Sequence, residues 1–209
     1  MRLLIVLSAA SIALSANGQN LLNNPSFEDG ISFDFSDPTA WNSFGDSFGG
    51  AALDISAPAE GARTGDRRLN LGINGPNLSG IIGTFQEIPF AVVEGQSYEA
   101  AAWFRTDGDF SGGQVEFSIE WFDAAGVEIE PAQSSLFLTP GSLTSSYQQQ
   151  MVSSVAPANA VRANVGIFAI IFDNSGALNV AVDDVSFVPA PTTASLVALG
   201  GIAALRRRR

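Results

Sequence analysis

The chain has 209 residues, of which 46% are hydrophobic and 15% are charged. This composition supplies enough apolar material for one domain with a hydrophobic core, and the length is too short for two large domains. It contains no cysteine and no histidine, which excludes disulfides, thiolate nucleophiles, imidazole bases and the usual zinc and copper ligands. Between Glu28 and Asp184 lie all 21 acids and five arginines, a net charge of −16 that disfavours nucleic acid and favours divalent cations or neutral ligands.

Residues 1–18 predict a secretory signal peptide. Met1 and Arg2 give a positive start, the run LLIVLSAASIAL is apolar, and small residues at 16 and 18 precede a cleavage site ahead of Gln19. The alternative is a buried first helix, which the polar stretch that follows at once disfavours. An exported chain without cysteine depends on its core, and on a metal if it binds one.

Residues 19–188 predict a single all-β domain, an antiparallel β-sandwich. Short apolar or alternating runs are separated by clusters of Gly, Asn, Asp, Ser and Pro, and no amphipathic helical period of useful length is present. Residues 31–50 are expected to form a long surface loop. The expected strands cover residues 51–55, 67–73, 84–92, 97–105, 114–122, 146–154, 161–171 and 178–188.

Alternation within these strands predicts a binding groove on outward-facing positions. If the outward sets of three strands share a sheet, the groove combines an indole with carboxylates, an amide and a guanidinium, a mixture that suits sugars. The alternative is that Trp103 is covered by the loop of residues 31–50 with Trp41 packed against it. Trp121 falls on the apolar phase of its strand and is predicted to lie in the core. The candidate carbohydrate ligands are Trp103, Arg105, Glu99, Glu116, Asn164 and Trp41.

Catalysis is not expected. Glu116 and Glu120 lie four residues apart on one strand face, roughly 13 Å at 3.3 Å per residue, which is wider than the carboxyl pairs of glycosidases. Serine hydrolysis would need a histidine, and the sequence has no nucleophile elbow, phosphate-binding loop or dinucleotide fingerprint.

The domain resembles the jelly-roll carbohydrate-binding modules attached to bacterial cellulases and xylanases. The matching pieces are NLLNNPSFEDG at 20–30 followed by Trp41, Arg63-Thr64-Gly65, SYEAAAWFR at 97–105 and VDDVSF at 182–187. The resemblance implies a galactose-binding-like jelly roll that binds polysaccharide without catalysis. These motifs are more specific for the fold than for the ligand, so a purely structural matrix protein with no glycan ligand is the alternative.

The same resemblance implies a structural Ca²⁺ held by Glu28 and Asp183. If the terminal strands pair, these two carboxylates are neighbours, and they repel one another unless a cation or a proton lies between them. Backbone carbonyls around residues 63–66 are expected to complete the shell. The alternative is that Glu28 forms an ordinary ion pair with Arg67 or Arg68.

Residues 189–209 have the architecture of a sorting tail. The apolar run at 194–205 is too short to span a bilayer, but it is expected to form a short hydrophobic helix that pauses there while a terminal arginine cluster stays on the cytoplasmic side. The parts of the motif are Pro189, Ala190, Pro191, Arg206, Arg207, Arg208 and Arg209.

This tail resembles the PEP-CTERM sorting domain, although Ala190 stands where that family has glutamate. The resemblance implies transient inner-membrane insertion, processing by an exosortase-type enzyme, and delivery to the cell envelope, cell surface or extracellular matrix of a Gram-negative-type bacterium. A plain C-terminal membrane anchor is the alternative.

Overall fold

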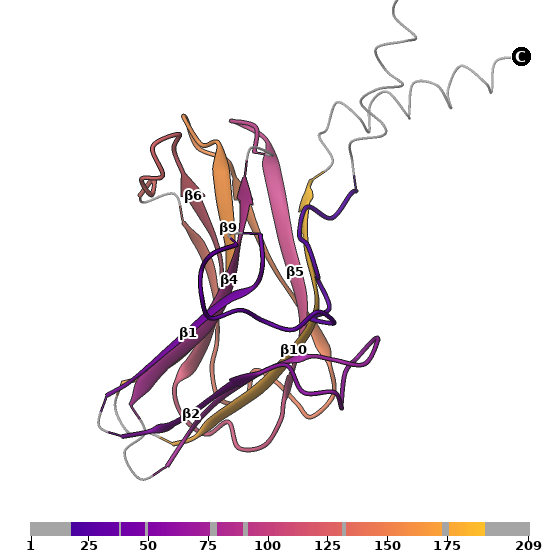
Figure 1. Cartoon of the computed structure of the whole chain (residues 1–209), viewed down its shortest axis with the longest axis vertical. Coiled ribbons are helices and arrows are strands. Elements are labelled where there is room, and N and C mark those ends of the chain that lie inside the picture. Colours follow the sequence, from indigo (N-terminus) through magenta and orange to yellow (C-terminus); the bar gives the residue numbers. More distant parts are fainter. Residues whose placement is uncertain are drawn as a thin grey trace, which may run out of the picture.

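The computed structural model describes residues 18–37, 39–48, 50–75, 79–89, 92–130, 133–172 and 176–190. These residues form an all-β domain of two antiparallel five-stranded sheets (Figure 1). The predicted signal peptide, apart from Gly18, and the predicted tail from Pro191 onward lie outside the described residues. Within the described part of the chain, no helix has the length and hydropathy needed to cross a bilayer.

Each sheet is assembled from strands that are mostly far apart in the sequence. Sheet A has the order β1 (Asn42–Ser47), β4 (Gly80–Pro89), β9 (Arg162–Ile171), β6 (Gln114–Phe122) and β7 (Ser134–Leu138). Sheet B has the order β2 (Ala52–Ser56), β3 (Leu69–Asn74), β10 (Leu178–Pro189), β5 (Ser97–Thr106) and β8 (Gln148–Val155). The predicted fold class, an antiparallel β-sandwich, agrees with this arrangement.

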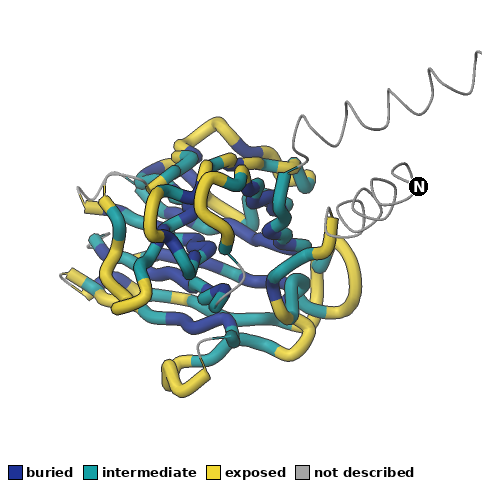
Figure 2. The backbone as a smooth tube through the Cα atoms, turned by 90° about the horizontal axis from the view of Figure 1, so that it is seen from above, coloured by how far each residue is buried: buried dark blue, intermediate teal, exposed yellow. Residues whose placement is uncertain are grey.

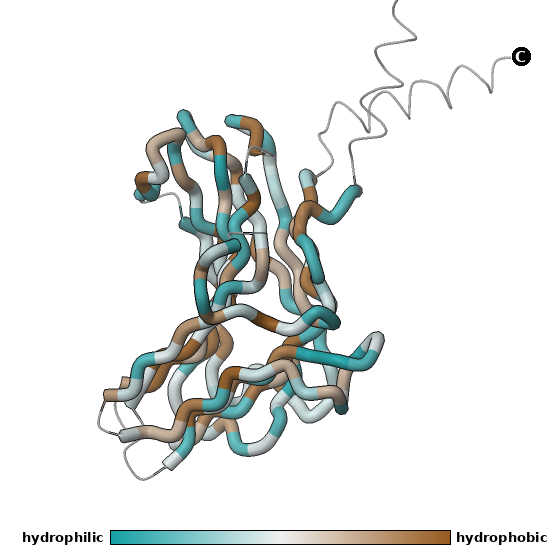
Figure 3. The backbone as a smooth tube through the Cα atoms, in the orientation of Figure 1, coloured by the Kyte–Doolittle hydropathy of each residue, from teal (hydrophilic) through white to brown (hydrophobic). Residues whose placement is uncertain are grey.

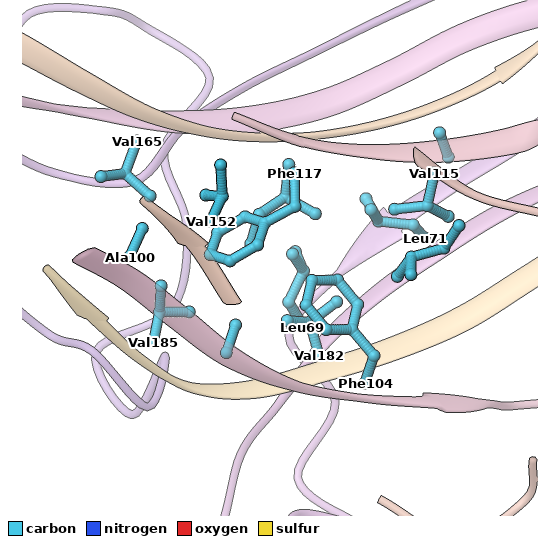
Figure 4. Close-up of a cluster of buried hydrophobic side chains, with 14 of the residues drawn as sticks. Leu69, Leu71, Ala100, Phe104, Val115, Phe117, Val152, Val165, Val182 and Val185 are labelled. Atoms are coloured by element: carbon cyan, nitrogen blue, oxygen red, sulfur yellow. The ribbon is translucent and has the colours of Figure 1, made fainter. Parts of the chain in front are cut away.

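The core lies between the two sheets. Buried residues occupy the interior and exposed ones the loops (Figure 2), and apolar and polar residues alternate along the strands (Figure 3). Phe104 of β5 and Phe117 of β6 meet edge to face across the interface, with ring centroids 5.5 Å apart, among the aliphatic side chains of Figure 4. Each such fully buried side chain contributes about 1.5–3 kcal/mol.

The N-terminal segment extends sheet B where β3 ends. Leu21 N–H donates to Phe187 O at 2.9 Å, and Val185 N–H donates to Pro25 O at 2.8 Å. The pairing of β10 with β3 runs from Leu178 to Val182 and ends there. The N-terminal segment takes the place of β3 beside the second half of β10. The predicted meeting of the two ends of the domain is therefore confirmed, although the segment forms no regular strand.

The predicted strands need correction at four places. Residues 42–47 lie in the predicted loop of residues 31–50 but form β1, because β4 supplies a full antiparallel partner to a segment of low β-propensity. β4 begins at Gly80 rather than residue 84, and β7 was not predicted. At the other end, β10 continues through Pro189, the first residue of the predicted tail, which pairs with Tyr98.

Candidate functional site

The predicted groove is not formed, because its residues lie on opposite sheets. Glu99, Trp103 and Arg105 are on β5 in sheet B, whereas Glu116 and Asn164 are on β6 and β9 in sheet A. Each of the five is on the outward phase of its strand, as alternation predicted. The outward faces of the two sheets point away from each other, so these residues cannot share one ligand.

Trp103 is covered by an arginine and not by the loop of residues 31–50. The guanidinium carbon of Arg63 lies 3.8 Å from the centre of the indole ring. Arg105, on the same face, pairs with Asp107 at 2.8 Å and lies 5.2 Å from the Tyr147 ring. These contacts come from packing around the loop of residues 57–68, so the structure gives Trp103 a partner other than sugar.

Trp41 lies in the core. It is 1% exposed, its ring centroid is 5.0 Å from that of Phe27, and its indole N–H donates to Asn24 O at 2.9 Å. It is therefore not available as a sugar platform. Trp121 is fully buried as predicted, and its indole N–H donates to Ser154 Oγ at 3.0 Å.

Glu28 and Asp183 both bind the segment 63–67 through its backbone amides. Asp183 Oδ2 accepts N–H bonds from Arg63 at 2.6 Å and Thr64 at 3.2 Å, and Glu28 accepts them from Asp66 and Arg67 at 3.0–3.1 Å. Burial raises the pKa of Asp183 despite these donors. The two carboxylates therefore converge on one loop, as the calcium hypothesis requires.

The side-chain ion pair offered as the alternative for Glu28 is not formed. The Arg67 guanidinium donates to Ala57 O, and Arg68 pairs with Asp107 at 2.6 Å. Oxygen-only ligands fit Ca²⁺, but no group of three or more acidic side chains among the described residues is placed to hold a metal. A calcium ion bound by Glu28 and Asp183 would need backbone carbonyl or water oxygens to complete its shell.

The outward face of sheet A carries an aromatic platform that the predicted site did not include. Phe168 of β9 lies over Gly83 and Gly166, and a Cβ atom at either glycine would overlap its ring. Two glycines thus allow the ring to lie down on the sheet. Phe44 of β1 is beside it, with ring centroids 5.9 Å apart, and Phe85 of β4 packs with Phe35 at 6.0 Å.

Polar side chains continue this face toward β6 and β7. Phe168 pairs across the strands with Glu116, which accepts hydrogen bonds from Ser135 Oγ at 2.6 Å and Gln133 Nε2 at 3.1 Å. Four residues further along β6, Glu120 lies opposite Asn164, whose amide donates to it at 3.4 Å. A half-buried aromatic ring is therefore flanked by hydrogen-bonding groups on one surface.

Glu120 titrates near neutrality. Burial raises its pKa to about 7, the negative charges of Glu128 and Glu116 add to the rise, and hydrogen bonds from Asn164 and Ser118 oppose it.

Three hollows follow β6 and β9 along this face. The first, of about 390 Å³, includes Gln114 and Ile170, the second, of about 410 Å³, includes Glu116, and the third, of about 110 Å³, includes Asn164. Their other lining residues come from neighbouring turns and strands, namely Ser111, Gly112, Gly113, Pro140, Phe172, Glu130, Gln133, Ser135, Phe137, Glu87, Phe122, Gly126 and Arg162.

Phe168 lies on the outward phase of its strand, but it was not among the residues predicted to bind sugar. The available signal was a phenylalanine on the same phase as Asn164, two residues after a glycine. Gly83, the other half of the cradle, comes from β4 and can be assigned only once the strand pairing is known.

No protein-family model matches the chain, and no curated protein sequence matches it either. Solved structures with the same fold include the enzymatically active domain of tailspike protein 4 from bacteriophage CBA120, at 13% identity and a TM-score of 0.59, over 80% of this chain and 21% of that one. A family 16 carbohydrate-binding module matches at 18% identity and TM-score 0.53, covering 81% of this chain and 99% of the module.

A family 4 carbohydrate-binding module is similar, at 17% identity, a TM-score of 0.53, and coverage of 80% and 99%. A further match, to a structure from the carbohydrate-binding modules of the β-sandwich superfamily, covers 83% of this chain and 63% of that one, at 16% identity and TM-score 0.54. The chain thus spans less than two thirds of the tailspike and superfamily structures and nearly all of the two single modules. At these identities, the likeness shows that the fold is that of carbohydrate-binding-module-like β-sandwiches.

Proposed function

We propose that this chain is an exported protein that binds carbohydrate without catalysis, on the outward face of sheet A. One observation carries the proposal: the Phe168 ring lies down over Gly83 and Gly166 and is flanked by carboxylate, hydroxyl and amide groups. The modules that share its fold bind carbohydrate, which supports the same role here.

The face supplies the two kinds of contact that sugar recognition needs. The C–H face of a sugar ring stacks on Phe168, and Phe44 extends the apolar surface toward β1. The Glu116 carboxylate accepts hydrogen bonds from the hydroxyls at the rim of the sugar, and the Asn164 amide donates hydrogen bonds to them. Two candidate ligands from the sequence, Glu116 and Asn164, thus remain in the proposed site, whereas Trp103, Arg105, Glu99 and Trp41 do not.

A non-catalytic role fits the spacing of the carboxylates. Glu116 and Glu120 share one face of β6 at four-residue separation, about 13 Å at 3.3 Å per residue, which exceeds the separation of glycosidase pairs. Glu116 and Glu120 are therefore too far apart to act as the acid and base of a glycosidase.

Export and sorting form the second part of the proposal. It rests on the sequence of residues 1–18 and of the tail from Pro189 to Arg209, whose parts beyond Ala190 lie outside the described residues. An exosortase-type enzyme is the proposed processing partner. Intact-mass measurement of the protein from its host tests this: we expect a chain that begins at Gln19 and lacks the four terminal arginines, and a full-length mass would contradict it.

Affinity electrophoresis through gels that contain soluble polysaccharides tests the binding. We expect at least one polysaccharide to retard the wild-type protein, Phe168→Ala to reduce the retardation, and Trp103→Ala to preserve it. Circular dichroism establishes that each variant is folded. Absence of retardation in every gel would refute carbohydrate binding and favour the structural matrix role.

A further inference from the structure

The outward face of sheet A has more negative charge than its own cations balance. Glu87 pairs with Arg162 at 3.4 Å. In the part of the chain that the structure describes, none of the ion pairs includes Glu116, Glu120 or Glu128. Adjacent like charges that lack a counter-ion destabilise one another, and the effect grows where a carboxylate is partly removed from water.

These carboxylates lie around one strand and one turn. Glu116 and Glu120 point outward from β6, and residue 128 forms an isolated bridge with Phe122 at the end of that strand. The bridge brings Glu128 close enough to Glu120 for its charge to raise the pKa of Glu120, together with burial. The negative charge is thus concentrated along β6, beside the Phe168 platform.

A buried hydroxyl between the two strand carboxylates is the second observation. Ser118 is fully buried on the outward phase of β6, and its Oγ makes no hydrogen bond of normal geometry in the described residues, although it is close enough to Glu120 to oppose the rise in the pKa of that group. It lies 3.0 Å from the position that a Cβ atom would occupy on Gly166, under the Phe168 platform. A buried hydroxyl without a hydrogen bond of normal geometry compensates the neighbouring carboxylates poorly, so their charge is left for a bound cation to balance.

We propose that the glycan bound on this face carries free amino groups, as a deacetylated amino-sugar polymer does. This inference rests on the proposed function and adds the substrate class. Protonated amines supply the missing positive charge to Glu116 and Glu120 and donate hydrogen bonds to their carboxylates. Neutral sugars leave the carboxylate charge uncompensated, and uronic acid polymers are repelled by it.

Calorimetric titration of the full chain with three hexasaccharides tests this inference. The probes are the fully deacetylated glucosamine hexamer, its fully N-acetylated counterpart and cellohexaose. We expect the deacetylated hexamer to bind at least about tenfold more tightly than the other two, equivalent to about 1.4 kcal/mol. The preference should shrink between about 0.1 M and 1 M salt, where the Debye length falls from about 10 Å to about 3 Å.

Two charge-neutralising variants locate the effect. Glu116→Gln combined with Glu120→Gln should remove the preference for the amine, whereas Glu99→Gln, on the outward face of sheet B, should keep it. A preference that survives the double substitution would mean that the general acidity of the domain causes it, and would overturn the inference.

The remaining outcomes separate this inference from the proposed function. Equal or tighter binding of the N-acetylated hexamer or cellohexaose overturns the amine preference and leaves carbohydrate binding in place. If none of the three hexamers binds and polysaccharide gels also fail to retard the protein, both the inference and the proposed function are refuted.

Discussion

The Arg63 guanidinium stacks on the indole of Trp103, with its central carbon 3.8 Å from the ring centre. The same guanidinium pairs with Asp184, and Thr64 beside it donates its hydroxyl to that carboxylate. Trp103 is thus one of the surfaces that hold the loop of residues 57–68 against sheet B. These contacts stabilise the loop, and the proposed glycan platform lies on the opposite side of the domain.

Replacement of Trp103 separates stability from binding. Trp103→Ala removes the cation–π contact and part of the buried ring, so we expect a loss of about 1–2 kcal/mol in the free energy of unfolding. Chemical denaturation measures that loss, and gel retardation by the best polysaccharide should stay at the wild-type value. Loss of retardation in the folded variant would mean that Trp103 takes part in glycan binding, contrary to this prediction.

The glycine cradle under Phe168 gives a second prediction. Gly166→Ala places a methyl group where the ring lies, so the ring must lift from the sheet and we expect glycan affinity to fall about tenfold, or about 1.4 kcal/mol. In a Phe168→Ala background the same glycine substitution should cost no further affinity, because nothing remains to be displaced. Additive losses in this double-mutant cycle, measured by titration calorimetry, would show that the two residues act separately.

The pKa of Glu120 gives a third prediction. In the unfolded chain this carboxyl titrates near 4.5, and burial in the folded domain raises its pKa to about 7. Between these values the folded state retains a proton that the unfolded state releases, so the contribution of Glu120 to stability decreases as the pH rises.

Glu120→Gln removes this titration. We therefore expect the melting temperature of the variant, minus that of the wild type, to increase from about pH 4.5 to about pH 7 and to stay level outside that window. Asp183 also has a raised pKa, but both proteins contain it and its effect cancels in the difference. A difference that does not change with pH would contradict the assignment to Glu120.

Calcium gives a fourth prediction. If Glu28 and Asp183 hold Ca²⁺ as the sequence predicts, saturating calcium stabilises the folded domain by about 2.7 kcal/mol at one hundred times the dissociation constant. Thermal melts in calcium and in EDTA measure this, and Glu28→Gln should abolish the difference. Identical melts of the wild type would mean that the amides of residues 63–67 are sufficient partners for both carboxylates.

Alternation of apolar and polar residues predicted which side chains of β5, β6 and β9 face inward, because the buried face of each strand carries the apolar residues. Alternation cannot tell to which sheet a strand belongs. Trp103 and Glu116 have the same phase on their strands, but β5 pairs with β10 and β6 pairs with β9. Pairing depends on contacts between residues far apart in the sequence, so the predicted single groove combined residues from opposite faces.

The elements missed by the sequence analysis are short edge strands. β1 reads NSFGDS, with glycine, serine and aspartate that are typical of loops, and it is held as a strand by its register with β4. The Phe168 platform was missed for a related reason, since half of its glycine cradle comes from β4. Local patterns are thus sufficient for the long central strands and insufficient where a neighbouring strand decides the structure.

The place of β10 determines when the domain can complete its fold. It is the last strand of the described residues and lies between β3 and β5 in the middle of sheet B, and the N-terminal segment also forms hydrogen bonds with it. A chain that emerges from the ribosome N-terminus first therefore lacks the centre of one sheet until residue 189 arrives. This order makes completion of the sandwich an event that follows synthesis of the whole domain.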